Sequence, residues 1–108
     1  MASITTQTTI TSSDIMKLPV NYDEIPQRKR REVREAYIEI QANQCHLCKA
    51  ELTKHPAKHI RAKPVRKALF PKGFFKNPVH LHHDHNSGMT IGAVHAYCNA
   101  VLWQYHGE

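Results

Sequence analysis

Two short runs of residues near the C-terminal end of the chain carry most of its reactive side chains. The first run is His80-Leu81-His82-His83-Asp84-His85, and the second is His95-Ala96-Tyr97-Cys98-Asn99. Imidazole titrates near neutral pH, so it can act as a general base, and it is also a common metal ligand. Thiolate sulfur binds soft metal ions and amide oxygen binds hard ones, so these side chains can hold metals of both kinds. This combination of side chains predicts metal-dependent chemistry.

A second pair of thiols lies earlier in the chain, in Cys45-His46-Leu47-Cys48. A Cys-x-x-Cys turn directs two thiolates at one point, and a His-x-x-Cys pair at the start of a helix does the same with one imidazole and one thiolate. Zinc prefers four such ligands in a tetrahedron. The alternative is that the cysteines are buried core thiols without a metal. The two pairs together predict a structural zinc site made by Cys45, Cys48, His95 and Cys98.

The remaining polar residues of the two runs predict a second, catalytic metal site. Adjacent residues of a strand point to opposite faces, so His82 and His83 can serve different purposes. Asn99 directly follows the expected zinc ligand Cys98, so the zinc would fix its position. We expect His82 and Asn99 to bind a divalent cation, with further oxygen ligands from water and phosphate. His83 is then the expected general base that activates water.

The elements that must position these side chains follow from apolar periodicity and turn residues. Residues 79–83 and 89–94 are predicted to form two strands joined by a turn at 86–88, because Asn and Gly supply the backbone conformations of a hairpin. Residues 96–105 are predicted to form a closing helix. The histidine run therefore lies on a hairpin, and the second run lies at the junction of a strand and a helix.

A further helix is predicted over residues 23–41, with Asn21 or Asp23 as its cap and Pro26 in its first turn. This helix has one apolar face and one charged face, and the charged face mixes basic and acidic residues. Its cationic cluster at 28–31 either forms solvated salt bridges or contacts phosphates. The apolar face could serve the core of the domain or a homodimer. Its residues recur at the spacing of a helix, and they are Val33, Ala36, Tyr37 and Ile40.

A long basic segment separates the first thiol pair from the histidine run. Residues 52–83 contain no Asp or Glu, and four prolines argue against long regular structure. We expect an extended loop with a short helical turn near 66–70. Its cations would neutralise the phosphates of a nucleic acid, and a solvated surface loop is the alternative. The candidate nucleic-acid-binding residues are Lys54, Lys58, Arg61, Lys63, Arg66, Lys67, Lys72 and Lys76.

The composition fits one small domain with a polyanionic partner. The 108 residues carry a formal net charge of +6 and a sequence pI of about 9.4, which favours nucleic acid. Three cysteines are an odd number, unlike a secreted disulfide scaffold, and no apolar run reaches membrane-spanning length. We therefore expect a cytoplasmic protein without membrane contact. Residues 1–20, rich in Thr and Ser, are expected to form a flexible tail rather than a signal peptide, and 21–108 a single domain.

Over about residues 45–102, the chain resembles the HNH nuclease superfamily, and it looks most like the recombination endonuclease VII branch that is common in phages. The resemblance implies an α+β fold. This is the small ββα-metal domain, or His-Me finger, here with a structural zinc, an N-terminal helix and a long basic loop. The matching motifs are Cys45-x-x-Cys48, Leu81-His82-His83-Asp84-His85, a hairpin with Gly92, and His95-x-x-Cys98-Asn99.

The resemblance also implies roles for individual residues. His83 falls on the general base, His82 on the first ligand of the catalytic cation and Asn99 on the second. His85 falls on a second histidine with a supporting or phosphate-facing role. The family usually has Asp at the position of His82, so Mn²⁺ or another softer divalent cation could replace Mg²⁺ here. His80 either supports His82 from the same strand face or is a surface histidine.

The activity that the resemblance implies is metal-dependent hydrolysis of phosphodiester bonds in double-stranded or branched DNA, with 5′-phosphate and 3′-hydroxyl products. A single site of this kind cuts one strand at a time, so nicking is expected. The alternative is a zinc-stapled nucleic-acid-binding module without catalysis. A zinc hydrolase acting on a small molecule would need an open zinc position, which four protein ligands do not leave.

Overall fold

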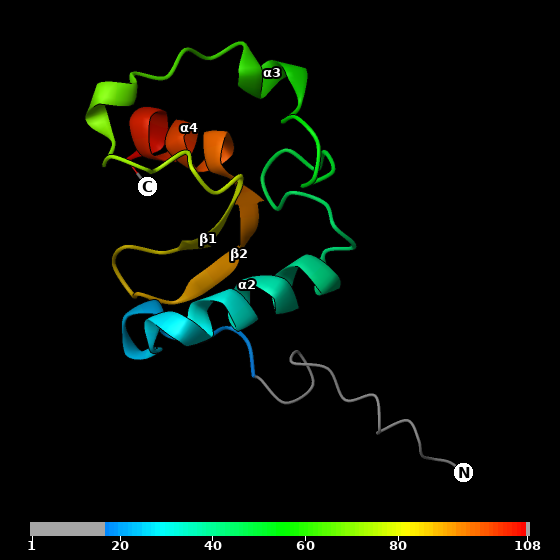
Figure 1. The fold of residues 1–108 in the computed structure, drawn as a ribbon, viewed down its shortest axis with the longest axis vertical. Coiled ribbons are helices and arrows are strands. Elements are labelled where there is room, and N and C mark those ends of the chain that lie inside the picture. The colour runs from blue at the N-terminus through cyan, green and yellow to red at the C-terminus, as the bar shows by residue number, and fades with distance from the viewer. Residues whose placement is uncertain (1–16, 108) are drawn as a thin grey trace.

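Two antiparallel strands and the helix that follows them form the centre of the fold (Figure 1). Strand β1 covers Val79–His83, strand β2 covers Thr90–His95 and helix α4 covers Ala96–His106, so α4 begins where β2 ends. The computed structural model describes residues 17–107, and most of the expected tail at 1–20 lies outside them. The predicted α+β class is confirmed. The two strands and the closing helix lie within one residue of their predicted ends.

The turn between the strands is held by Asp84. Its carboxylate accepts hydrogen bonds from the Ser87 hydroxyl at 2.8 Å and from the Ser87 amide at 3.1 Å, and these bonds lower the pKa of Asp84 below its ordinary value. Gly88 follows with a φ of +79°, in the left-handed region that favours glycine. Its amide donates to the Asp84 carbonyl at 2.7 Å. The predicted hairpin turn therefore forms around an anchored carboxylate.

Helix α2 covers Gln27–Ile40 and packs against the two strands (Figure 1). The predicted start at residue 23 was wrong, because Tyr22–Glu24 form a separate 3-10 turn, η2, capped by the Asn21 side chain. Ile25 between them is extended, with φ −90° and ψ 136°. A residue that precedes proline is disfavoured in the helical region, so Pro26 separates the two elements.

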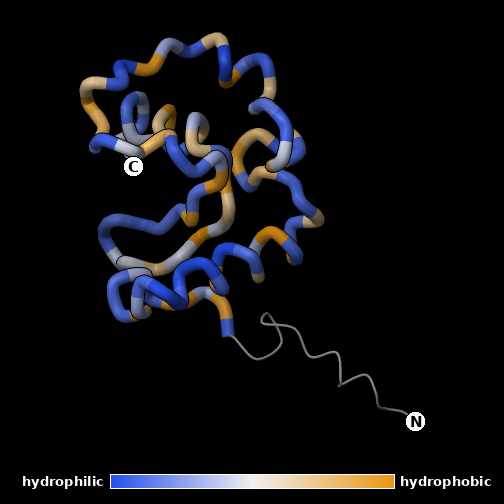
Figure 2. The backbone as a smooth tube through the Cα atoms, in the orientation of Figure 1, coloured by the Kyte–Doolittle hydropathy of each residue, from blue (hydrophilic) through white to orange (hydrophobic). Residues whose placement is uncertain are grey.

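The apolar face of α2 contributes three of its four predicted residues to the core. Val33, Ala36 and Tyr37 are buried, whereas Ile40 is 59% exposed because it is the last residue of the helix. Figure 2 shows α2 as hydrophilic over most of its length and β2 as far more apolar. None of the helices within residues 17–107 combines the length and the apolarity needed to cross a membrane.

The core lies where α2, the strands and α4 meet. The segment before α2 covers part of it, since Leu18 and Val20 pack against the buried residues. This segment runs beside β2, because the Thr90 amide donates to the Val20 carbonyl at 2.8 Å. The buried cluster consists of Val33, Tyr37, Cys45, Leu52, Ile60, Ala93, Val94, Cys98 and Val101.

The basic segment passes over α4 and returns to β1 (Figure 1). It contains helix α3, Lys58–Arg61, and a 3-10 turn η3, Lys67–Leu69. The η3 turn confirms the helical turn predicted near 66–70, whereas α3 was not predicted. The segment is therefore anchored to α4 by side chains that hydrogen bond its backbone at 63–66, namely Tyr97, Gln104 and Tyr105.

Candidate metal centre and the pocket beside it

The four predicted zinc ligands converge on one point. The sulfurs of Cys45, Cys48 and Cys98 and a ring nitrogen of His95 all lie within 4.8 Å of one another. His95 Nδ1 is 3.5 Å from the Cys48 sulfur and 3.5 Å from the Cys98 sulfur. In a tetrahedral site with Zn–S of about 2.3 Å and Zn–N of about 2.0 Å, neighbouring sulfur and nitrogen ligands are about 3.5 Å apart. The group could therefore hold a zinc ion.

Backbone hydrogen bonds fix the positions of these four ligands. The Cys-x-x-Cys turn is closed by the Cys45 amide, which donates to the Ala50 carbonyl at 2.8 Å. The turn is tied to β2 by the His46 amide, which donates to the Ala93 carbonyl at 2.9 Å. The other two ligands come from the last residue of β2 and the first turn of α4. The cluster therefore joins three parts of the chain that are distant in sequence.

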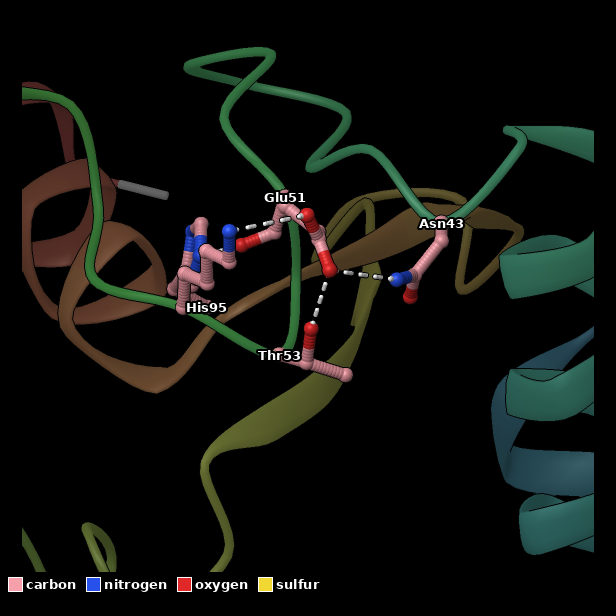
Figure 3. A network of polar contacts seen from close by, with 5 residues as sticks. Asn43, Glu51, Thr53 and His95 are labelled. Carbon is pink, nitrogen blue, oxygen red and sulfur yellow. Dashed lines mark hydrogen bonds and ion pairs between the residues drawn. The ribbon is translucent and has the colours of Figure 1, made fainter.

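The second ring nitrogen of His95 fixes which nitrogen faces the sulfurs (Figure 3). His95 Nε2 donates to the Glu51 carbonyl at 2.9 Å, so Nδ1 keeps its lone pair for a metal. The Glu51 carboxylate accepts from the Thr53 hydroxyl at 2.6 Å and from the Asn43 amide at 3.4 Å. These contacts hold the carbonyl in place, and a metal-ligating histidine commonly has such a partner.

Hydrogen bonds to two of the sulfurs favour a thiolate at Cys45. The Ala57 amide donates to the Cys48 sulfur at 3.4 Å, and the Cys48 amide donates to the Cys45 sulfur at 3.5 Å. A hydrogen bond from Cys98 lowers the pKa of the Cys45 thiol to about 4, while the same contact and burial raise the pKa of Cys98. Cys45 is therefore ready to bind as a thiolate.

A pocket of about 680 Å³ opens beside this cluster. It is walled by η2, α2, β1, α4 and the end of the basic segment. Within the described part of the chain, the eight basic residues predicted to bind nucleic acid do not line it. The pocket does collect all four residues that were predicted to be catalytic, namely His82, His83, His85 and Asn99.

The hairpin contains a bulge beside two of these histidines, with Ile91 of β2 as the extra residue. His82 pairs with Gly92, but His83 pairs with Thr90, so the register shifts between the two histidines. Both histidines line the pocket, as every residue of β1 does, so the expected division of roles between them stays a prediction. His82 is 4% exposed, whereas His83 is half-buried.

His80 is part of the site, although the sequence left its role open. Its Nδ1 accepts a hydrogen bond from the Asn99 side-chain amide at 3.1 Å, and its Nε2 donates to the Phe74 carbonyl at 2.8 Å. Burial lowers the pKa of His80, which favours this neutral form. The Asn99 amide nitrogen is therefore held by His80, which leaves its oxygen for another ligand. The signal for this role was the two-residue spacing from His82 on the strand.

His83 is stacked on Tyr22 from the η2 turn. The two ring centroids are 4.0 Å apart and the rings are nearly parallel, at 5°. The Arg30 guanidinium lies over the same Tyr22 ring, 4.1 Å from its centroid. Burial, and then the nearby His85, lowers the pKa of His83, so this ring is neutral at neutral pH. No sequence pattern pointed to Tyr22.

Two arginines of α2 supply the positive charge of the pocket. Arg30 and Arg34 line it, one helical turn apart on the same face. Arg30 Nε is buried and has no hydrogen-bond partner within the described residues. Arg31, by contrast, forms an exposed ion pair with Glu35 at 3.3 Å, and contact of the 28–31 cluster with phosphates stays a prediction.

The charge of the pocket suits an anion. Its lining contains four histidines, two arginines and two asparagines, and no carboxylate from residues 17–107. A cation held there by His82 and Asn99 alone would lack a negative ligand. An anionic group such as a phosphate would complete both the charge balance and the coordination.

Comparisons of the chain with models of protein families, with curated proteins and with solved structures found no match. The interpretation of the site therefore rests on the residues and the geometry described above.

Proposed function

We propose that this protein is a metal-dependent endonuclease of the HNH type that hydrolyses phosphodiester bonds of DNA. One observation carries the proposal. The candidate base His83 and the candidate cation ligands His82 and Asn99 line a single pocket, and that pocket contains two arginines and no carboxylate. This composition fits an anionic substrate whose charge is balanced by the protein and by a cation.

His83 acts as the general base in this proposal. No hydrogen bond within the described residues occupies its ring nitrogens, and its lowered pKa keeps it neutral and able to accept a proton. It takes a proton from water as the water oxygen bonds to phosphorus. The bond from phosphorus to the 3′-oxygen then breaks and the leaving oxygen takes a proton from a solvent water, so the products carry a 5′-phosphate and a 3′-hydroxyl. Stacking on Tyr22 keeps the ring in one orientation.

His82 and Asn99 hold the catalytic cation, which would stabilise the charge that develops on the phosphate and the leaving oxygen. The donor set fits such an ion only in part, since it offers one nitrogen and one oxygen. The phosphate and water must supply the remaining ligands. We therefore expect weak cation binding in the absence of substrate, and tolerance of Mn²⁺ or other softer ions as well as Mg²⁺.

The zinc-binding group would have a positional role. It lies at the junction of β2 and α4, and Asn99 directly follows its ligand Cys98. The eight cations of the basic segment lie outside the pocket, where they would bind neighbouring phosphates without reading sequence. The hydrolysis is thus assigned to the pocket, and the sequence-independent affinity for DNA is assigned to the basic segment.

A plasmid nicking assay tests the proposal. The zinc-loaded protein is freed of exchangeable cations, and Mg²⁺, Mn²⁺, Ni²⁺ or Co²⁺ is then restored singly. We expect nicking with at least one ion and its loss in a His83→Ala variant. His59→Ala is the matched control, because His59 is exposed and does not line the pocket.

The test also separates the second candidate function, a zinc-stapled nucleic-acid-binding module without catalysis. The same basic segment and zinc-binding group would support that function. It requires DNA binding without cleavage under any cation, and a His83→Ala variant that binds DNA as the unmodified protein does. Cleavage that persists in the His83→Ala variant would reject the assignment of the base.

A further inference from the structure

The pocket has an aromatic side that the proposed hydrolysis does not use. Phe70, Phe74 and Trp103 line it. Their rings contact one another, with centroid distances of 5.3 Å between Phe70 and Trp103 and 4.7 Å between Phe70 and Phe74. Trp103 is nevertheless 43% exposed, whereas a large apolar side chain that serves only packing is usually buried. The pocket therefore presents an aromatic surface that is already formed and still open.

This aromatic surface is continuous with the polar part of the site. Trp103 follows Asn99 by four residues on α4, so the two side chains lie on the same helix face about one turn, or 5.4 Å, apart. Phe74 packs its ring edge-on against His80 at 4.6 Å, and its carbonyl accepts the hydrogen bond from the same histidine. A ligand in the polar part would therefore reach Trp103 within the same pocket.

The two parts together define the chemistry of the occupant. The polar part is cationic and suits a phosphate, while the aromatic part suits a flat ring close to that phosphate. A nucleotide has this arrangement, because one sugar separates its base from its phosphate. In a duplex the base faces are stacked on neighbouring bases, so only an unpaired nucleotide can offer a face to Trp103. Stacking of a base on an aromatic side chain contributes about 1–3 kcal/mol.

We propose that the pocket binds one unpaired nucleotide, with its phosphate toward Arg30, Arg34 and Asn99 and its base stacked on Trp103. The inference rests on the proposed nuclease function and names its substrate. Cleavage would be faster at a nucleotide in a single-stranded segment, a gap or a flap than at one in continuous duplex. The pocket volume of about 680 Å³ lies within the usual range for sites that enclose a small ligand.

Trp103 provides a direct readout of binding, because it is the only tryptophan of the chain. Its fluorescence is followed during titration of the zinc-loaded protein without added catalytic cation. The probes are a single-stranded oligonucleotide, the same strand with abasic sugars throughout, the fully paired duplex, a mononucleotide and inorganic phosphate. We expect strong quenching by the single strand, and little quenching by the abasic strand, the duplex or phosphate.

Two variants of α4 test the stacking. Trp103→Leu keeps an apolar helix residue but removes the ring, so we expect about 5- to 150-fold weaker binding of a labelled single strand and unchanged binding of the duplex. Tyr105→Leu is the control, because Tyr105 is also 43% exposed but does not line the pocket. Its hydroxyl hydrogen bonds the Pro64 carbonyl at 2.6 Å, so this variant also reports any effect of loosening the basic segment.

The outcomes distinguish this inference from the proposed function. Quenching by the single strand without cleavage under any cation would leave the nucleotide site standing and reject the nuclease. Equal cleavage of duplex and single strand, unchanged in Trp103→Leu, would overturn the nucleotide site and leave the nuclease standing. Equal quenching by the abasic strand would overturn base stacking. A mononucleotide that binds as tightly as the oligonucleotide would assign the pocket to a free nucleotide and overturn the polymer substrate.

Discussion

Tyr22 links two residues that lie far apart in the sequence. Its ring stacks on His83 and also lies under the guanidinium of Arg30, at 4.0 Å and 4.1 Å respectively. The candidate base and the candidate phosphate ligand are therefore held by one ring. A cation over an aromatic ring gains stabilisation when it is partly desolvated, as Arg30 is. This arrangement places positive charge next to the base without an ion pair that would neutralise it.

Replacing Arg30 by Gln should weaken the interaction with phosphate. A hydrogen bond to a charged group contributes about 1.5–3 kcal/mol, so we expect kcat/KM for nicking to fall about 10- to 100-fold. Arg31→Gln is the control, because Arg31 is exposed and pairs with Glu35 on the surface. Exposed ion pairs contribute little to stability, so the kcat/KM of the Arg31→Gln variant should be unchanged. Equal losses in the two variants would show that α2 acts through its total charge and not through the pocket.

The pH dependence of nicking should report the environment of His83. Its pKa lies below 6.5 because of burial and of the positive charge of His85, with smaller lowering by His82 and Arg30 and an opposing effect of Asp23. The general base must be neutral, so kcat/KM should rise with pH, and the midpoint of this rise should lie below 6.5. Removing His85 removes a cause of the lowering, so His85→Ala should move this rise to higher pH.

The matched control for the pH profile is His59→Ala, which removes an exposed histidine that does not line the pocket. Its profile should coincide with that of the unmodified protein. A rise that shifts to lower pH in His85→Ala would contradict the assignment of His83 as the base.

At the scale of elements, the hairpin and the η2 turn support each other. The Tyr22 amide donates to the Gly88 carbonyl at 2.7 Å, which joins the tip of the hairpin to the turn that carries the Tyr22 ring. The Asn21 side chain lies against Gly88 and also caps η2. The position of Tyr22 over His83 therefore depends on its backbone hydrogen bond to Gly88 and on the packing of the Asn21 side chain against this glycine.

Gly88→Ala should destabilise the protein more than Gly73→Ala. Both glycines have positive φ, +79° and +86°, which costs a non-glycine residue about 1–2 kcal/mol. At Gly88 the added Cβ would also lie 2.9 Å from Asn21 Oδ1, whereas at Gly73 nothing lies within 4 Å. Urea denaturation measures the two free energies of unfolding. Equal losses would mean that Asn21 moves aside without cost and that the contact with η2 is dispensable.

At the scale of the whole molecule, the Cys3His group fastens together most of the fold. It joins the turn after α2, the end of β2 and the start of α4, and it is contacted by the backbone at Glu51 and Ala57. A domain of this size buries a modest core, so a metal that binds only the folded state contributes much of its stability. The same group sets the position of Asn99, so stability and the candidate activity should depend on one ion.

Removing zinc with a strong chelator should lower Tm and abolish nicking together. Zinc at about 1,000 times its dissociation constant adds about 4 kcal/mol to folding. Cys98→Ser should show the same loss of stability with zinc present. Asn99→Ala is the control, since it should abolish nicking yet keep one zinc per chain and a Tm that still falls on chelation. Metal analysis and thermal denaturation provide the measurements, and a Tm that does not respond to chelation would contradict a structural zinc.

The sequence alone determined the features that are local. The two strands, the closing helix and the four zinc-binding candidates were predicted correctly, because turn residues, apolar periodicity and ligand spacing act over a few residues. The start of α2 was predicted wrongly, because the effect of Pro26 on Ile25 separated a short 3-10 turn from the helix. Ile40 was assigned to the core by its periodicity, but its place at the end of the helix left it exposed.

Only the tertiary structure decided what lines the pocket. Tyr22, Arg30 and Trp103 come from separate elements, and no spacing in the sequence indicates that they line the same pocket as His83. The bulge beside His82, in which Ile91 of β2 is the extra residue, depends on how the two strands pair across the hairpin. Spacing encodes contacts within one element. Contacts between elements depend instead on how the helices and strands pack, and packing is settled only when the whole chain folds.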